Sequence, residues 1–139
     1  MNWKKIWIAF IVVYVVYQIT NLIIHSVILM GFYDQLSIDN VFRSAADMPG
    51  WVFWVTAIVF SFFFVFIFVK GYENRGIGEG IRYGLYIGIL YYFVMSFNQF
   101  VTYPLPYSLI WYWIILGVIQ TIICGIATAL VYKPKAAAA

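Results

Sequence analysis

The sequence has 139 residues, of which 65% are hydrophobic and only 9% are charged, and its mean hydropathy is +0.94. Soluble globular domains carry about a quarter charged residues, and no aqueous fold could bury so large an apolar fraction. A hydrocarbon core of about 30 Å requires roughly 20 apolar residues per spanning helix, which leaves room for four spans and short loops. The composition predicts one all-α transmembrane domain over residues 1–135.

The net charge of +3 arises from eight basic and five acidic residues that are scattered along the chain. No basic run is present that could follow a phosphate backbone, so nucleic acid is not an expected partner. Cys124 and His25 are the only residues of their kinds, which excludes an intrachain disulfide and the usual zinc ligand sets. The alanines at 136–139 are interpreted as a tag or an unassigned tail.

The first predicted helix covers residues 6–32 and ends before Asp34. Lys4 and Lys5 precede it as in a signal peptide, but the apolar stretch is longer than the roughly 7–15 residues of such a segment. It also lacks a small-residue cleavage site. We therefore expect an uncleaved first membrane helix.

Residues 34–50 form the longest predicted loop, and Pro49 and Gly50 mark its end. Asp39, Arg43 and Asp47 are spaced at i, i+4 and i+8. If this loop is helical, the three side chains would form a small ion-paired stripe on a surface helix, with a stabilisation of only tenths of a kcal/mol.

The second predicted helix, 51–69, has no charge and is apolar on all sides, so much of it should face lipid. A charged segment follows from Lys70 to Arg82. Its closely spaced glycines superficially resemble a phosphate-binding loop, but they follow a membrane helix and lack the Gly-Lys-Ser/Thr ending. A flexible hinge is the favoured interpretation.

The third predicted helix covers 81–103 and is stopped by Pro104 and Pro106, since proline has no amide hydrogen and disfavours helix before it. The fourth covers 108–132, with Ser108 as its expected N-cap. Lys133 and Pro134 provide its stop signal.

Orientation follows from the basic residues near the spans, which are retained on the cytoplasmic side. With four spans, only one of the eight basic residues, Arg43, lies on one side of the membrane. The other seven lie on the opposite side: Lys4, Lys5, Lys70, Arg75, Arg82, Lys133 and Lys135. The predicted topology is N-in and C-in.

Three stretches, Asn21–Tyr33, Gly80–Gly88 and Pro104–Leu109, carry a resemblance to a family. Together with Cys124-Gly125 shortly before Val131-Tyr132-Lys133, they resemble a group of small uncharacterised bacterial four-helix integral membrane proteins. The resemblance covers most of the chain. It implies a location in the bacterial inner membrane and supplies no activity.

Gln18, Asn21 and His25 share one face of the first helix because they are spaced at i, i+3 and i+7. Polar groups are costly in hydrocarbon, so this face should look into the bundle or toward a partner. One interpretation is a contact for quinone, lipid or another small molecule, or a proton-accepting histidine. The favoured one is a set of interhelical hydrogen bonds, each worth about 0.6 kcal/mol.

Asn98, Gln99 and Gln120 are the other amides at membrane depth, and Gln120 could join Gln18 and Asn21. The spans contain no embedded carboxylate or lysine, which disfavours an ion-coupled pump. A haem would need a second axial ligand for His25, with Met30 and Met95 as weak candidates. No cofactor or metal is expected. The tentative ligand-binding set is Gln18, Asn21, His25, Asn98 and Gln120.

Small residues recur every three or four positions in the last two spans, and such stripes let membrane helices approach closely. The predicted packing residues are Gly80, Gly84, Gly88, Gly117, Thr121 and Gly125. Internal packing is favoured over contact with another subunit.

Two functions remain open. The favoured one is a structural or accessory membrane subunit that packs against a larger membrane complex or against itself. The alternative is a small-molecule membrane protein, either a passive oligomeric pore or carrier, or a quinone or lipid site near His25. No two carboxylates are placed for acid and base catalysis, so an enzyme is not expected.

Overall fold

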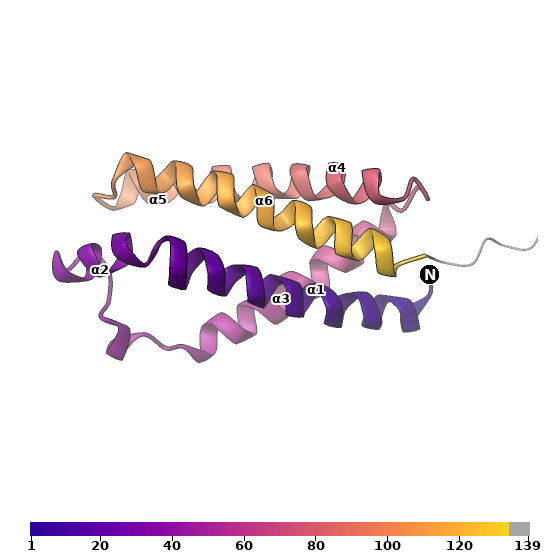
Figure 1. Ribbon diagram of the computed structural model, residues 1–139, viewed down its shortest axis with the longest axis horizontal. Coiled ribbons are helices and arrows are strands. Elements are labelled where there is room, and N and C mark those ends of the chain that lie inside the picture. Colours follow the sequence, from indigo (N-terminus) through magenta and orange to yellow (C-terminus); the bar gives the residue numbers. More distant parts are fainter. Residues whose placement is uncertain (134–139) are drawn as a thin grey trace, which may run out of the picture.

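The computed structural model describes residues 1–133, and within that range every regular element is a helix. Four helical segments are long and apolar enough to cross a membrane (Figure 1). They comprise Trp3–Ile28, Trp51–Lys70, Ile77–Thr102 and Tyr107–Val131. The predicted four-helix membrane bundle is confirmed.

The first span consists of α1 (Trp3–Ile23) and a π-helical turn, η1 (Ile24–Ile28). It starts three residues before the predicted position, because the Asn2 side chain caps it by accepting a hydrogen bond from the Lys5 amide at 3.1 Å. It ends at Ile28 and not at residue 32. Leu29 breaks it with φ −101° and ψ 1°, and a separate helix, α2 (Met30–Ile38), follows.

The remaining elements follow in chain order. They are η2 (Ala45–Asp47), α3 (Trp51–Lys70), α4 (Ile77–Gly88), the π-helical η3 (Ile89–Phe93), α5 (Val94–Thr102) and α6 (Tyr107–Val131). The helices α4, η3 and α5 form one continuous span, which starts at Ile77 and so four residues before the predicted position.

The connection between α2 and α3 does not carry the expected charged stripe. The chain leaves helical geometry at Asn40, whose φ is 59°. Asp39 accepts from the Gln35 amide at 3.2 Å, and Asp47 accepts from the Ser44 hydroxyl at 2.6 Å. The two ion pairs within residues 1–133 lie elsewhere, so the expected stripe is absent from this connection.

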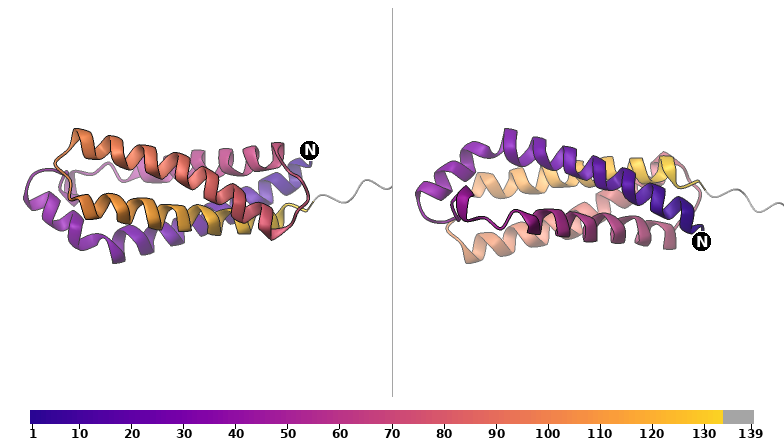
Figure 2. Two further views of the ribbon diagram at one scale, coloured as in Figure 1. Left: turned by 90° about the horizontal axis from the view of Figure 1, so that it is seen from above. Right: turned by 90° about the horizontal axis from the view of Figure 1, so that it is seen from below.

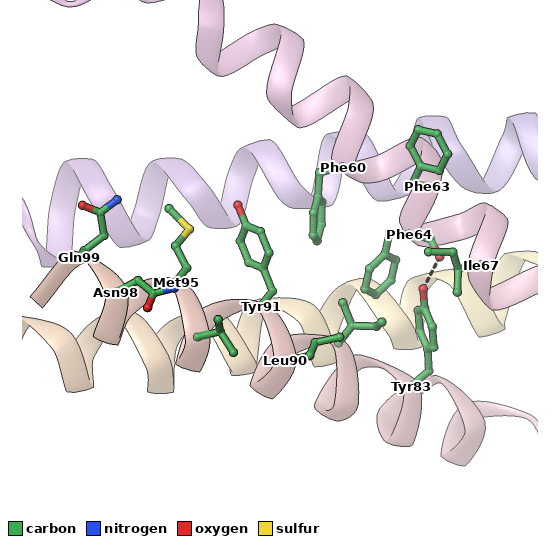
Figure 3. A pocket seen from close by; sticks show the side chains of 12 residues that line it. Phe60, Phe63, Phe64, Ile67, Tyr83, Leu90, Tyr91, Met95, Asn98 and Gln99 are labelled. Carbon is green, nitrogen blue, oxygen red and sulfur yellow. Dashed lines mark hydrogen bonds between the residues drawn. The ribbon is translucent and has the colours of Figure 1, made fainter. Parts of the chain in front are cut away.

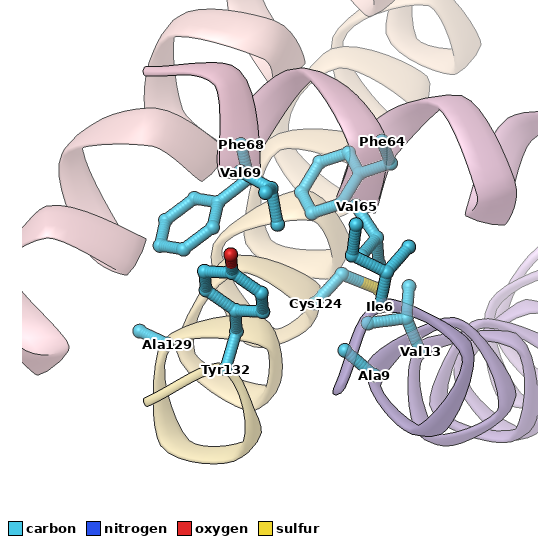
Figure 4. Packing of buried hydrophobic residues seen from close by; sticks show 10 residues of the cluster. All are labelled: Ile6, Ala9, Val13, Phe64, Val65, Phe68, Val69, Cys124, Ala129 and Tyr132. Atoms are coloured by element: carbon cyan, nitrogen blue, oxygen red, sulfur yellow. The ribbon is translucent and has the colours of Figure 1, made fainter. Parts of the chain in front are cut away.

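The helices pack in the spatial order α3, α1, α6 and α4, so α1 touches both α3 and α6 while α4 lies along α6 (Figures 1 and 2). At one end, α1, α3 and α6 share an apolar cluster (Figure 4). Its buried members are Ile6, Ala9, Val13, Phe64, Val65, Phe68, Val69, Cys124, Ala129 and Tyr132. The N-terminus, the loop between α3 and α4, and the end of α6 lie here, and we call this the inner end.

At the opposite end, which we call the outer end, a second apolar cluster joins η1, α2 and the start of α6. It consists of Ile24, Leu29, Leu36, Leu105, Leu109, Ile110 and Ile114. α2 lies at this end of the bundle, where its buried side chain Leu36 packs into the cluster (Figures 1 and 2). The predicted positions of Lys135 and of the tail 136–139 lie outside the described residues.

The predicted small-residue stripes face one another in the contact between α4 and α6. A β-carbon on Gly80 would collide with the Gly125 carbonyl, and one on Gly84 would lie 2.6 Å from the Ile122 α-carbon. A β-carbon on Gly88 would meet the Thr121 side chain. The two backbones therefore touch directly along this line, as small residues allow in membrane helices.

Candidate functional site

His25 lies in the π-helical turn at the outer end and is tied to α2 and α6. Its Nδ1 atom lies 2.6 Å from the Tyr33 hydroxyl, and that hydroxyl accepts a hydrogen bond from Trp113 Nε1 at 2.8 Å. The imidazole and the phenol ring are stacked with centroids 5.8 Å apart. The break at Leu29 brings Tyr33 back over His25, so the partner of His25 comes from the neighbouring helix α2 and not from α1.

The indole nitrogen is only a donor, so the Tyr33 oxygen accepts a hydrogen bond from Trp113 Nε1. The direction of its bond to His25 Nδ1 is set by the imidazole tautomer, because the phenol can donate its own proton or accept a second hydrogen bond. Burial raises the pKa of Tyr33 to about 12, against a smaller opposing effect of the Trp113 hydrogen bond. The phenol stays protonated at neutral pH, so the trio works as a structural tie.

The other two residues of the predicted polar face do not join His25. Gln18 donates to the Tyr14 hydroxyl at 3.2 Å within the same helix. Asn21 is half-buried, and its side chain makes no hydrogen bond to residues 1–133. The suggested cluster of Gln18, Asn21 and Gln120 does not form.

Gln120 lies instead in a different network in the middle of the bundle, where it is 1% exposed. Its Oε1 atom accepts from the Tyr92 hydroxyl at 2.7 Å. Its Nε2 atom donates to Thr20 Oγ1 at 2.9 Å and to the Tyr17 carbonyl at 3.3 Å. The amide joins α6 to α1 and to η3, and both of its polar atoms are used.

Sequence reasoning missed Thr20 and Tyr92 as members of this network. Thr20 is a common helix residue, and Tyr92 is one tyrosine of twelve. The structure explains the small residue at Gly117, because a β-carbon there would collide with the Tyr92 ring. Gly117 thus leaves room for an aromatic side chain from η3, and does not oppose the glycines of α4.

The loop between α3 and α4 contains a second feature that the sequence did not reveal. Glu79 is 5% exposed, and its carboxylate accepts from the backbone amides of Glu73 at 2.6 Å and Arg75 at 2.8 Å. The Glu73 carboxylate pairs with Arg75 at 3.1 Å and Arg82 at 2.7 Å. The segment expected to be a flexible hinge is therefore a loop held by two carboxylates.

Asn98 and Gln99 line an open groove between α3 and the span formed by α4, η3 and α5 (Figure 3). The groove has a volume of about 600 Å³ and is otherwise lined by aromatic and aliphatic residues together with the Tyr83 and Tyr91 phenols. Met95, one of the two weak candidates for a haem ligand, also lines it. None of the lining residues carries a charge.

The described part of the chain holds no group of three or more His, Cys, Asp or Glu side chains that could bind a metal ion. Its buried Gln120, Thr121, Thr128 and Glu79 side chains are all hydrogen-bonded within the described residues, whereas the buried Ser61 hydroxyl has no partner there. The fold and this tied interior define a class, a small multi-pass helical membrane protein. No protein-family model, curated protein or solved structure matches the chain.

Proposed function

We propose that the protein is an accessory subunit of a membrane assembly, without catalytic chemistry of its own, that docks through the outer half of α3. The observation that carries this proposal is the incomplete packing of α3. α3 packs with α1 and α6 in the apolar cluster at the inner end, but it diverges from the other helices toward the outer end, so that side of the bundle is open there (Figure 1).

The uncovered half of α3 is large and aromatic. Trp51 is 67% exposed, Phe53 58% and Trp54 60%. Within residues 1–133, the only hydrogen bond between α3 and another helix lies in its inner half, where the Phe64 carbonyl accepts from the Tyr83 hydroxyl at 2.6 Å.

Lipid can cover any apolar helix, so exposure alone does not distinguish lipid from protein. Association in a membrane depends on close packing and on interhelical hydrogen bonds, and the outer half of α3 has few of either within its own chain. Aromatic residues are enriched at protein interfaces, where they bury a large area with few rotatable bonds. A transmembrane helix of another subunit would supply the packing that α3 lacks.

The orientation and the location belong to the same proposal. The inner end carries the basic residues Lys4, Lys5, Lys70, Arg75, Arg82 and Lys133, which supports placing it in the cytoplasm. The resemblance to bacterial four-helix membrane proteins supports the inner membrane.

The test is purification of the untagged protein from its native membrane in a mild detergent. We expect a second membrane protein at fixed stoichiometry, identified by mass spectrometry, or a defined homo-oligomer. Replacing Phe53 and Trp54 together by Ala should abolish the assembly, whereas Tyr112→Ala on α6 should leave it intact. A wild-type protein that elutes as a monomer bound only to lipid would contradict the proposal.

A further inference from the structure

The groove between α3 and the α4–η3–α5 span has a defined shape. At the inner end, Tyr83 closes it by its hydrogen bond to the Phe64 carbonyl, and the two rings lie 4.8 Å apart. Farther out, the Phe60 and Tyr91 rings also pack against each other, with centroids 6.1 Å apart (Figure 3), and beyond this pair α3 diverges from the span. The result is a long, wedge-shaped open groove that runs over these two ring pairs.

The length and the lining of this groove suit a hydrocarbon chain. Tyr83 and Gln99 are sixteen residues apart on one span, so the groove is about 24 Å long. Its volume is about 600 Å³, and its lining is apolar over most of that length. One extended acyl chain can lie along such a groove.

The polar end of the wedge indicates what the chain carries. Asn98 and Gln99 lie three or four residues before the end of α5 at Thr102, or about 5–6 Å from it. The interfacial layer on each side of a bilayer is of about that thickness, so these amides lie where the hydrocarbon meets the head groups. The glycerol ester carbonyls of a phospholipid lie at this depth.

The two amides are also free to bind. Neither side chain makes a hydrogen bond to residues 1–133, and each can donate two protons. Because the lining has no charge, the site suits the uncharged ester region and leaves the phosphate outside in water. A mainly apolar pocket with a few polar groups at one end is typical of a ligand site.

We infer that this groove binds one glycerophospholipid, with an acyl chain between α3 and the α4–η3–α5 span and its ester carbonyls at Asn98 and Gln99. This is a site in the protein itself and does not depend on the proposed partner. Because the groove lies beside the exposed outer half of α3, the bound acyl chain would form part of the surface that contacts a partner subunit.

The experiment is native mass spectrometry of the full chain after delipidation and titration with dioleoylphosphatidylethanolamine in detergent. We expect one lipid per protein. Val94→Trp, which fills the groove, should weaken binding at least tenfold. The control Ile89→Trp, on the same span but outside the groove, should bind as wild type does. Circular dichroism and elution volume establish that both variants fold.

A second variant tests the polar end without filling the groove. Asn98→Leu combined with Gln99→Leu should weaken binding of the diester lipid about sevenfold, the effect of two hydrogen bonds at membrane depth. Binding of the matching diether lipid should change little. Equal lipid retention by wild type and Val94→Trp would show annular lipid only and overturn the inference. Preferential retention of a prenyl quinone from vesicles that contain both would also overturn it.

Discussion

Gly84→Ala tests the direct backbone contact between α4 and α6. The added methyl group would collide with the Thr121 carbonyl oxygen and would lie 2.6 Å from the Ile122 α-carbon. Ordinary contact starts at 3.4 Å, so the helices must separate by at least about 0.8 Å. A gap of that size forfeits a quarter to a half of the dispersion energy of the contacts it opens.

Overpacking of this kind costs about 1–3 kcal/mol, and the upper end applies because the opposing atoms are backbone and cannot rotate away. Alanine recovers about 1 kcal/mol of helix propensity, which leaves a net loss of about 2 kcal/mol, or roughly thirtyfold in the folding equilibrium. Gly78→Ala in the same helix is the matched control, because nothing lies within 4 Å of its new methyl group.

The assay is reversible unfolding by sodium dodecyl sulfate in mixed micelles, followed by circular dichroism. We expect Gly84→Ala to unfold at lower dodecyl sulfate than wild type, and Gly78→Ala to be equal to wild type or slightly more stable. If both variants match wild type, the two helices do not touch at Gly84 and the packing argument is wrong.

Three further predictions concern the polar ties and the topology. Glu79→Ala should lower the unfolding free energy by about 1–3 kcal/mol and make the inner loop cleavable by protease, because it leaves two backbone amides without an acceptor. Glu73→Ala should cost at most about 1 kcal/mol, because it removes only exposed ion pairs. Equal effects of the two variants would contradict the role of the buried Glu79 carboxylate. His25→Gln should lower the unfolding free energy by less than about 1 kcal/mol, because the amide can donate to the Tyr33 hydroxyl or accept from it, and His25→Leu by about 1–3 kcal/mol; equal losses would show that this bond is absent. In intact cells, a cysteine at Ser37 should react with an impermeant maleimide and one at Asn74 should not, and the reverse pattern would invert the topology.

The spans were predictable because each depends on a local property, the length of an apolar run. The ends of the helices were less predictable, and the first span shows the reason. The break at Leu29 depends on α2 packing Leu36 into the outer cluster, a contact set by tertiary structure and not by any helix-breaking residue.

The polar contacts were harder still to predict from the sequence. Helical spacing predicted a shared face for Gln18, Asn21 and His25, but it says nothing about partners on other elements. The Tyr33 hydroxyl meets Trp113 from 80 positions away, and Gln120 meets Thr20 from 100 positions away. Both π-helical turns also shift the register of side chains, so a regular 3.6-residue pattern misplaces residues such as Tyr92.

The groove could not be predicted, because it arises from the angle at which α3 leaves the bundle. Asn98 and Gln99 were identified as polar residues at membrane depth, but their common position at the mouth of a wedge required the structure. The acyl-chain site therefore rests on tertiary geometry, whereas the amide pair that marks it was visible in the sequence.

Site-specific photo-crosslinking in native membranes tests the central claim, that the outer half of α3 docks another subunit. A benzoyl-phenylalanine at Phe53, 58% exposed on α3, is compared with one at Tyr112, 46% exposed on α6. The account predicts a single protein adduct of defined mass at Phe53, identified by mass spectrometry, and only lipid adducts at Tyr112. Lipid adducts alone at both positions would contradict it.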